Sequence, residues 1–165
     1  MSTADAKLPA VPPMDGPAPH LLVVRAPYYV EVVDGLRDGA ARLLRAAGAD
    51  FDVLDVAGAL ELAGAVRLAV RGSRRFDGYV VLGCVVRGDT DHYEYVCREA
   101  MAGLTQVVQQ FGLCLGNGLL TVDLLEQAID RSLSPEGGAN GHNKGAEAAA
   151  AALLQIRAAR WLGAG

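Results

Sequence analysis

Residues 79–95 read Tyr-Val-Val-Leu-Gly-Cys-Val-Val-Arg-Gly-Asp-Thr-Asp-His-Tyr-Glu-Tyr, and this segment indicates which class of fold to expect. A hydrophobic run over 79–86 stops at the turn 87–90, and a helical pattern with His92 in its first turn begins directly after it. A strand that leads at once into a helix is typical of α/β proteins. In such proteins, ligands bind at the carboxyl ends of strands, beside the amino ends of the following helices. The turn after residue 86 is therefore the first candidate for a binding site.

The same alternation runs through the rest of the chain. Hydrophobic runs cover residues 21–24, 51–56, 79–86 and 113–120, and helical patterns cover 30–48, 60–70, 92–111, 121–131 and 144–162. The fourth run is interrupted by Gly116-Asn117-Gly118, and Thr121 can cap the helix after it. Parallel strands joined by right-handed crossovers, with helices on both faces of the sheet, explain this order. We expect one doubly wound, three-layer α/β domain with a four-stranded, mainly parallel sheet, of the flavodoxin-like type.

Two segments stand outside this pattern. Residues 1–19 hold five of the seven prolines, and such a stretch forms neither a helix nor a ladder, so we expect a proline-rich tail there. The domain would then cover residues 20–165. Gly, Ser and Asn dominate residues 132–141, which we interpret as a loop before the last helix.

The composition is that of a globular protein and argues against several other classes of protein. The chain has 165 residues, 52% hydrophobic and 21% charged, which suits one globular domain with its own core. A net charge of −4 argues against a nucleic-acid partner. No apolar run approaches the roughly 20 residues of a membrane span, and the N-terminus lacks a signal-peptide core. The three cysteines lack Cys-x-x-Cys spacing, so we expect no structural metal site and a cytoplasmic location.

The turn before His92 has two interpretations. Asp91 and Glu94 have the spacing of a capping box at the start of the helix. The same helix N-terminus, with Asp89 and Thr90 beside it, offers unpaired N–H groups and positive partial charge to an anion such as phosphate. That charge favours a neutral imidazole, which can accept a proton and return it. Capping and ligand binding do not exclude each other, so both interpretations stay open.

Further candidates each have a structural explanation. Glu61 follows a glycine turn after the second run, where the helix dipole favours a carboxylate. Tyr28, at the end of the first run, is more often a packing residue than a stacking platform. Cys84 lies within an apolar strand and is expected to act as a small hydrophobe rather than as a nucleophile. Each of them nevertheless falls on the sheet edge that carries His92.

Arg131 and Lys144 are two cations at predicted helix ends, and the helix dipole favours only one of them. Arg131 ends a predicted helix, where a cation is favoured by the dipole. Lys144 begins the last helix, where a cation is slightly disfavoured, and this indicates another role such as pairing with an anion. Asn143, beside Lys144, is a suitable N-cap.

Three ordered motifs together are more specific than any of these residues alone. They are GCVVRGDTDHYEYV at 83–96, GLLT at 118–121 with EQAIDR at 126–131, and NKGAEAA at 143–149. With these motifs the chain resembles the 6,7-dimethyl-8-ribityllumazine synthase family of riboflavin biosynthesis over nearly all of residues 20–162. The resemblance implies a transferase that condenses 5-amino-6-(D-ribitylamino)uracil with 3,4-dihydroxy-2-butanone 4-phosphate and releases phosphate and water. It implies no metal and no organic cofactor.

The resemblance also implies roles for residues. His92 would be the catalytic proton-transfer residue. Arg131 would bind the butanone phosphate, assisted by the backbone of Asp89 and Thr90 and by Lys144. Seven further positions would lie against the pyrimidine and its ribityl chain: Tyr28, Ala59, Leu60, Glu61, Cys84, Val85 and Val86. Asn117 occupies a position that helps to cover the substrate site from the neighbouring subunit.

The chain departs from the common family pattern around the pocket. Leu60 stands where an aromatic residue is usual, Asn117 where Phe is frequent, Ala57 and Ala63 where Pro is common, and Pro27-Tyr28-Tyr29 replaces Arg-Phe-Asn. A non-catalytic flavin- or lumazine-binding protein, or a structural shell protein of the same fold, is the alternative. Family members are pentamers or icosahedral shells with sites between subunits. Shell-forming relatives tend to have a shorter, tighter connection than the Gly-rich one between Arg131 and Lys144, so the resemblance implies a free pentamer.

Overall fold

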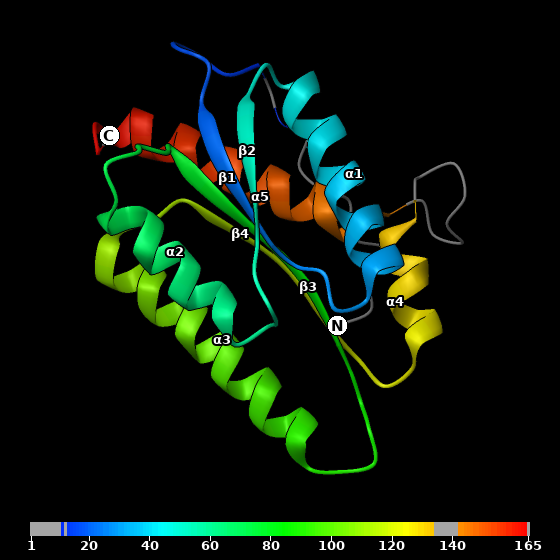
Figure 1. The fold of residues 1–165 in the computed structure, drawn as a ribbon. Helices are drawn as coiled ribbons and strands as arrows, with labels where there is room; N and C mark the ends of the chain where they lie inside the picture. Colours follow the sequence, from blue (N-terminus) through cyan, green and yellow to red (C-terminus); the bar gives the residue numbers. More distant parts are fainter. Residues whose placement is uncertain (1–10, 12, 134–141, 165) are drawn as a thin grey trace.

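The computed structural model describes residues 11, 13–133 and 142–164, which form four strands and five helices (Figure 1). In chain order these elements are β1 (His20–Ala26), α1 (Val30–Ala46), β2 (Asp50–Asp55), α2 (Glu61–Arg71), β3 (Gly78–Val86), α3 (His92–Phe111), β4 (Leu115–Val122), α4 (Leu125–Ser132) and α5 (Lys144–Leu162). The predicted alternation of strands and helices is confirmed. None of the helices described is long and apolar enough to span a bilayer.

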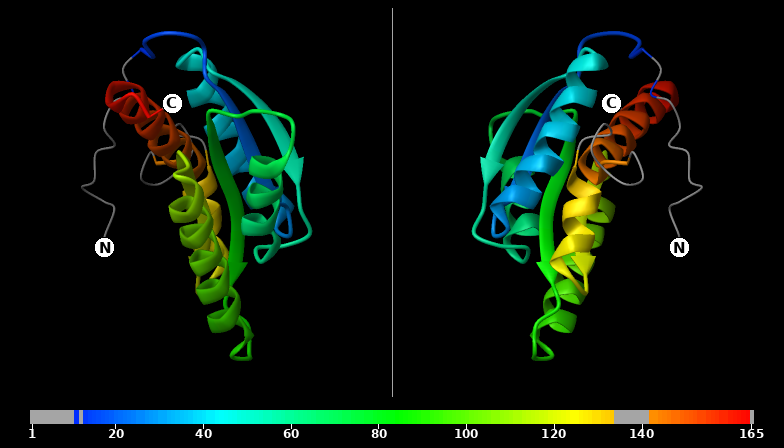
Figure 2. Two further views of the ribbon diagram at one scale, coloured as in Figure 1. Left: turned by 90° about the vertical axis from the view of Figure 1, so that its left-hand side faces the viewer. Right: turned by 90° about the vertical axis from the view of Figure 1, so that its right-hand side faces the viewer.

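The four strands form one parallel sheet in the order β2-β1-β3-β4. Leu21 on β1 lies opposite Phe51 on one side and Gly78 on the other, so β1 and β3 are the central strands. Because all strands run the same way, the carboxyl ends of β1, β2 and β3 meet at one edge of the sheet. This edge is at the bottom of Figure 1, where the connection from β3 to α3 projects beyond the other elements in both views of Figure 2.

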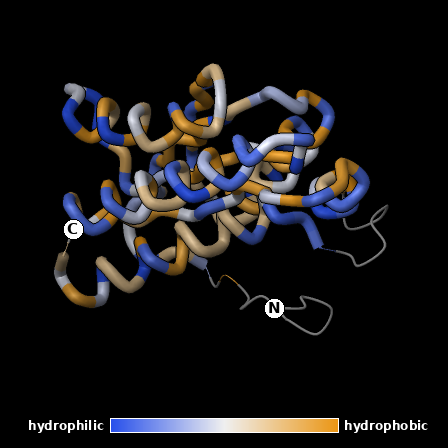
Figure 3. Tube along the Cα trace, turned by 90° about the horizontal axis from the view of Figure 1, so that it is seen from below, coloured by the Kyte–Doolittle hydropathy of each residue, from blue (hydrophilic) through white to orange (hydrophobic). Residues whose placement is uncertain are grey.

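Helices cover both faces of the sheet, which confirms the three-layer architecture. In Figure 1, α2 and α3 lie on one side of the sheet, α1 and α4 lie on the other, and α5 passes behind the strands. Residues of α5 share the core of α1 and α4. The sheet has a hydrophobic core on each face. Successive side chains of a strand point to opposite faces, so alternate residues belong to alternate cores. Val80 packs with Leu36 and Leu153 in the core beneath α1 and α5, and Val81 packs with Leu62 in the core beneath α2 and α3. Hydrophobic and hydrophilic segments alternate along the helices in Figure 3, as expected of helices buried on one side.

The edge strand β2 differs from the central strands. β3 is buried from Gly78 to Cys84, because helices cover it on both faces. Val53 and Leu54 on β2, in contrast, are 45% and 42% exposed. The expectation that the strands are covered on both faces therefore holds for β3 but not for β2.

The region around Thr121 was predicted incorrectly. Thr121 does not cap a helix but lies within β4, opposite Val85, and the glycines before it do not interrupt the strand. β4 stays paired with β3 as far as Val122, so α4 begins only at Leu125. The start of α4 is instead held by the Gln127 side chain, whose Oε1 accepts from the backbone N–H groups of Leu124 at 3.2 Å and of the preceding residue at 3.0 Å.

The predicted capping box at the start of α3 is also absent. Asp91 is the residue before α3, but its backbone is already helical and its side chain makes no capping hydrogen bond. The Glu94 carboxylate turns away from the helix end and forms an ion pair with Arg87 at 2.9 Å. A nearby cation outcompetes the single backbone N–H group that a capping box would offer.

The predicted tail and loop are only partly described. Residues 1–10, 12 and 134–141 lie outside the described residues. The described end of the tail contacts the domain, because Arg160 on α5 donates to the carbonyl oxygens of Asp15 at 2.5 Å and Pro17 at 2.8 Å. Met14 packs against the core beneath α1 and α5. The division of the chain at residue 19 stays a prediction.

Candidate active site

A cleft of about 320 Å³ opens at the edge where β1, β2 and β3 end. Its size is near the lower limit of small-molecule sites, which enclose roughly 300 Å³ or more. The loops after β1 and β2, the end of β3 and the first turns of α3 supply its walls. The lining residues are Tyr28, Tyr29, Gly58, Ala59, Leu60, Glu61, Cys84, Val85, Val86, His92 and Val96.

Most of the predicted site residues meet in this cleft. The apolar wall is the end of β3, where Cys84 is buried and Val85 and Val86 are half-buried. Tyr28 and Leu60 stand at the rim, 76% and 49% exposed. The cleft therefore has an apolar floor and an open mouth, and the predicted pyrimidine-binding residues share a single cavity.

His92 is the titratable group that lies where this cleft meets the exposed turn before α3. It is the first residue of α3 and is exposed, and its side chain lines the cleft opposite the loops that follow β1 and β2. An imidazole at this position can reach both a molecule in the cleft and a group bound at the helix N-terminus. The position therefore suits proton transfer to or from a molecule bound in the cleft.

Arg87 anchors the turn that carries His92, a role that the sequence interpretation missed. Its guanidinium donates to Asp123 at 2.7 Å, pairs with Glu94 at 2.9 Å and lies 4.2 Å from the ring centroid of Tyr93. The hydrogen bond to Asp123, followed by the one to Glu94, raises the pKa of Arg87 above its ordinary value. Arg87 thus ties the β3–α3 turn to the β4–α4 turn. The sequence signal is the charge of two acidic residues, of which Glu94 is near Arg87 in the chain and Asp123 is 36 positions away.

Cys84 has the properties of a core residue. Its side chain is 5% exposed, and burial, with a smaller contribution from Cys97, raises the pKa of its thiol to about 11. The nucleophilic form of cysteine is the thiolate, which is scarce at neutral pH when the pKa is this high. The structure supports the interpretation of Cys84 as a small hydrophobe in the pocket wall.

The remaining predicted residues lie outside the cleft in a single chain. Asp89 and Thr90 are exposed in the turn before α3. Asn117 on β4 turns toward α3, with Nδ2 3.1 Å from the Met101 sulfur and Oδ1 accepting from a neighbouring backbone N–H. Arg131 is exposed on α4, on the opposite face of the sheet from α2 and α3.

Lys144, the first residue of α5, is also outside the cleft. Its ammonium forms a close ion pair with the Glu147 carboxylate, one turn along the same helix. His142 Nδ1 lies 3.7 Å from the other oxygen of that carboxylate. The predicted pairing of Lys144 with an anion is thus met within the chain by Glu147.

A second cavity, of about 330 Å³, lies at the opposite edge of the sheet, around Arg74, Tyr79 and Cys114. It contains none of the predicted site residues and lies at the amino ends of the strands. Ligands of α/β proteins bind at the carboxyl ends, so the first cleft is the candidate site. Within the described residues, no cluster of His, Cys, Asp or Glu is arranged to hold a metal ion.

Comparison with known proteins identifies the family. A family model for 6,7-dimethyl-8-ribityllumazine synthase matches residues 18–160. The chain belongs to this family. A lumazine synthase 1 of Rhizobium meliloti (strain 1021) is 41% identical over 149 residues, covering 88% of this chain and 94% of the relative. A lumazine synthase of Agrobacterium fabrum is 40% identical over 149 residues, covering 88% and 97%. One of Bartonella tribocorum is 41% identical over 138 residues, covering 84% and 88%.

Membership confirms the fold, the family and the enzyme class that the motifs implied. Lumazine synthases are transferases of riboflavin biosynthesis that use small-molecule substrates and form homo-oligomers. The cleft therefore belongs to a subunit that has neighbours, and residues far from it in one chain can still lie near a cleft of another subunit.

Proposed function

We propose that this chain condenses 5-amino-6-(D-ribitylamino)uracil with 3,4-dihydroxy-2-butanone 4-phosphate to 6,7-dimethyl-8-ribityllumazine, with release of phosphate and water. The observation that carries this proposal is a single cleft in which His92 faces the loops after β1 and β2 and the end of β3. In a lumazine synthase, that cleft combines a pocket for a flat heterocycle with a proton-transfer group.

The pyrimidine would lie against the apolar end of β3. Val85 and Val86 offer a half-buried apolar surface, and Tyr28 at the rim offers an exposed ring. An aromatic side chain can stack on a planar heterocycle, and burial of both faces stabilises the complex. Ala59, Leu60 and Glu61 close the opposite side, where the Glu61 carboxylate can accept hydrogen bonds from substrate N–H or O–H groups.

His92 would move the protons that the reaction requires. The pyrimidine amine attacks the ketone, the carbinolamine loses water and the phosphate then leaves. Each step needs a proton accepted or returned, and a positioned general acid–base contributes about 10²–10⁴-fold to such steps. Because His92 borders both the cleft and the β3–α3 turn, it would lie between the two substrates.

Arg131 would bind the phosphate of the ketone in a cleft of the neighbouring subunit, with Asn117 covering the same site. The guanidinium is exposed, and Nη1 donates to the Gln127 carbonyl at 2.7 Å, which fixes its orientation. Among the described residues, no carboxylate lies within ion-pair distance of Arg131, so its charge is available to an anion. A guanidinium binds phosphate with paired hydrogen bonds. Asp89, Thr90 and Lys144 would assist, although Glu147 already offsets the charge of Lys144.

The assembly would be a free pentamer in the cytoplasm, with residues 20–165 as the catalytic domain and residues 1–19 as its tail. The long connection between α4 and α5 supports the pentamer over an icosahedral shell. The three thiols support a reducing compartment.

Absorbance of the lumazine product tests the proposed reaction. Purified protein is incubated with both substrates, and product must form faster than in a control without protein. A rate no higher than this control would contradict the proposal. Tight binding of lumazine or riboflavin without turnover would then support the non-catalytic alternative, which the departures from the family pattern at Leu60 and Asn117 favour.

A further inference from the structure

Asn143 is a buried polar residue outside the cleft, with 3% of its surface exposed. It precedes α5, and its Oδ1 accepts from the backbone N–H groups of Gly145 at 2.9 Å and Ala146 at 3.0 Å. Asn143 is therefore the N-cap of α5, as the sequence predicted. Capping uses only the oxygen of this side chain.

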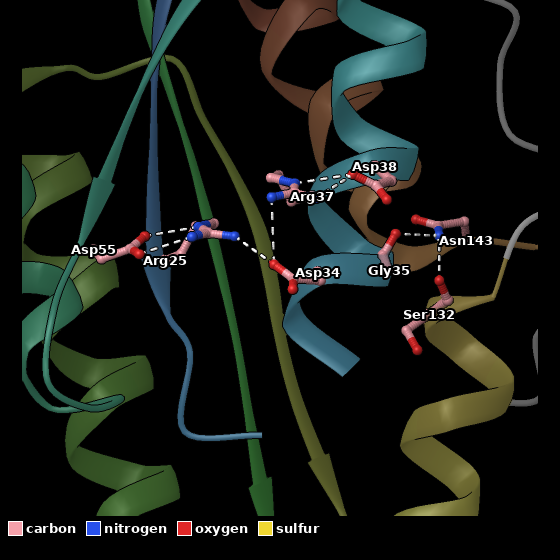
Figure 4. A network of polar contacts seen from close by, with 8 residues as sticks. All are labelled: Arg25, Asp34, Gly35, Arg37, Asp38, Asp55, Ser132 and Asn143. Carbon is pink, nitrogen blue, oxygen red and sulfur yellow. Dashed lines mark hydrogen bonds and ion pairs between the residues drawn. The ribbon is translucent and has the colours of Figure 1, made fainter. Parts of the chain in front are cut away.

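The amide nitrogen of Asn143 makes contacts that capping does not require. Nδ2 lies 2.7 Å from the carbonyl oxygen of Ser132, 3.0 Å from that of Gly35 and 3.1 Å from that of Leu133 (Figure 4). These carbonyls belong to α1 and to the end of α4. Serine, threonine or aspartate would cap α5 as well, but they have no NH₂ group with which to reach both other helices. Asn143 thus joins three helices through one side chain.

Glycines on the surrounding helices make room for this junction. A Cβ on Gly39 would lie 2.0 Å from the Asn143 Oδ1, and one on Gly35 would lie 2.5 Å from the Ser132 carbonyl oxygen. A Cβ on Gly145 would lie 1.9 Å from the Leu36 carbonyl oxygen. No side chain could be added at these positions without moving a helix or the amide. Close packing of α1 and α5 therefore fixes the position of the Asn143 amide.

We infer that Asn143 is a positioning residue for Arg131 and Lys144, the two cations proposed to bind the substrate phosphate. Arg131 directly precedes Ser132, and Lys144 directly follows Asn143. The hydrogen bond from Asn143 to Ser132 therefore holds the backbones of both cations at a fixed separation, whatever the length of the connection between the two helices. This inference rests on the proposed function.

Asn143→Ser tests the inference, because serine keeps a capping oxygen and removes both amide donors. We expect the KM for the phosphate substrate to rise about tenfold, as for the loss of one hydrogen bond, and the KM for the pyrimidine to stay within about twofold. A role in stability alone would lower the melting temperature and the active fraction but would leave both KM values unchanged. That result would overturn the inference.

A second variant disturbs the junction without changing Asn143. Gly39→Ala places a methyl group against the Asn143 amide from α1, and we expect the same selective rise in the KM for the phosphate substrate. Gly64→Ala is the matched control, since a Cβ there meets no atom within 4 Å. If Gly39→Ala behaves like Gly64→Ala in both KM values, the amide does not position the phosphate site.

Arg131→Ala, measured in parallel, separates this inference from the proposed function. If it leaves the KM for the phosphate substrate unchanged, the proposed role of Arg131 is wrong and the inference about Asn143 falls with it. If Arg131→Ala raises that KM and Asn143→Ser does not, only the inference is wrong.

Discussion

The guanidinium of Arg25 donates from Nε and Nη2 to the two carboxylate oxygens of Asp55, each over 2.7 Å (Figure 4). Its Nη1 reaches Asp34 on α1 at 2.8 Å. The Arg25 side chain is 11% exposed, and Asp55 is the last residue of β2. The pair therefore joins β1, β2 and α1 directly before the loop that forms one wall of the cleft.

Asp55→Asn should destabilise the protein by about 1 kcal/mol at pH 7, because it removes a bidentate charged pair whose carboxylate is half exposed. Hydrogen bonds from Arg25 lower the pKa of Asp55. Its stabilising contribution is therefore present above the unfolded pKa, about 3.9, and is lost as the pH falls through the lower folded value. Urea unfolding at pH 7 and at pH 3 or below measures this difference. A gap between wild type and variant that does not shrink in acid would contradict the assignment.

Gly116→Ala should cost about 3 kcal/mol or more, because its Cβ would lie 1.8 Å from the Ala148 carbonyl oxygen, a backbone atom that cannot move aside. Gly64→Ala should instead gain up to about 1 kcal/mol, since it is a helical glycine with open space around it. Thermal unfolding of both variants at one protein concentration gives the comparison. Equal melting temperatures would show that β4 and α5 do not pack as closely as described.

His92→Ala should lower kcat about 100-fold or more while changing both KM values little, because a general acid–base acts in the transition state more than in substrate binding. Steady-state lumazine formation, corrected for the uncatalysed rate, measures the effect. A variant that keeps the full kcat would remove His92 from the mechanism.

Cys84 should resist alkylation in the folded protein at pH 8, since it is buried and its pKa is raised to about 11. Mass spectrometry after iodoacetamide treatment, with and without urea, locates the modified thiols. We expect a Cys84 adduct only in the unfolded sample. Rapid modification of Cys84 in the folded protein would reopen the interpretation of this residue as a nucleophile.

The proposed pentamer should have a mass of about 86 kDa, five times the 17.2 kDa of one chain. Light scattering coupled to size-exclusion chromatography measures this mass directly. A particle of megadalton mass would contradict the free pentamer and would indicate a closed shell.

The layered fold and most of the cleft were predictable from local patterns. The buried run of β3 and the helical spacing of α3 are properties of neighbouring residues, and both elements appear where the sequence predicts them. Because parallel strands end at a common edge, the residues after β1, β2 and β3 were expected to meet there. Tyr28, Glu61 and His92 lie together for this reason.

The sequence did not show that the residues predicted to cap α3 and α4 would take other partners in the folded chain. Glu94 was expected to complete a capping box at the start of α3, but it pairs instead with Arg87, which also binds Asp123. Thr121 was expected to cap α4, but pairing with β3 extends β4 past it. In the first case an ion pair, and in the second the pairing of two strands, replaced the expected capping hydrogen bond.

The sequence alone indicated the order of the elements and the edge of the sheet that carries His92, since each depends on residues close together in the chain. It also indicated the family, through three short motifs in a fixed order. Only the tertiary structure revealed that α4, which carries Arg131, and α3 lie on opposite faces of the sheet. Only the structure, too, revealed that the Asn143 amide joins three helices. These relationships depend on how packed helices approach each other. Glycines permit this close approach, but a glycine in the sequence does not show which distant side chain or carbonyl group will pack against it.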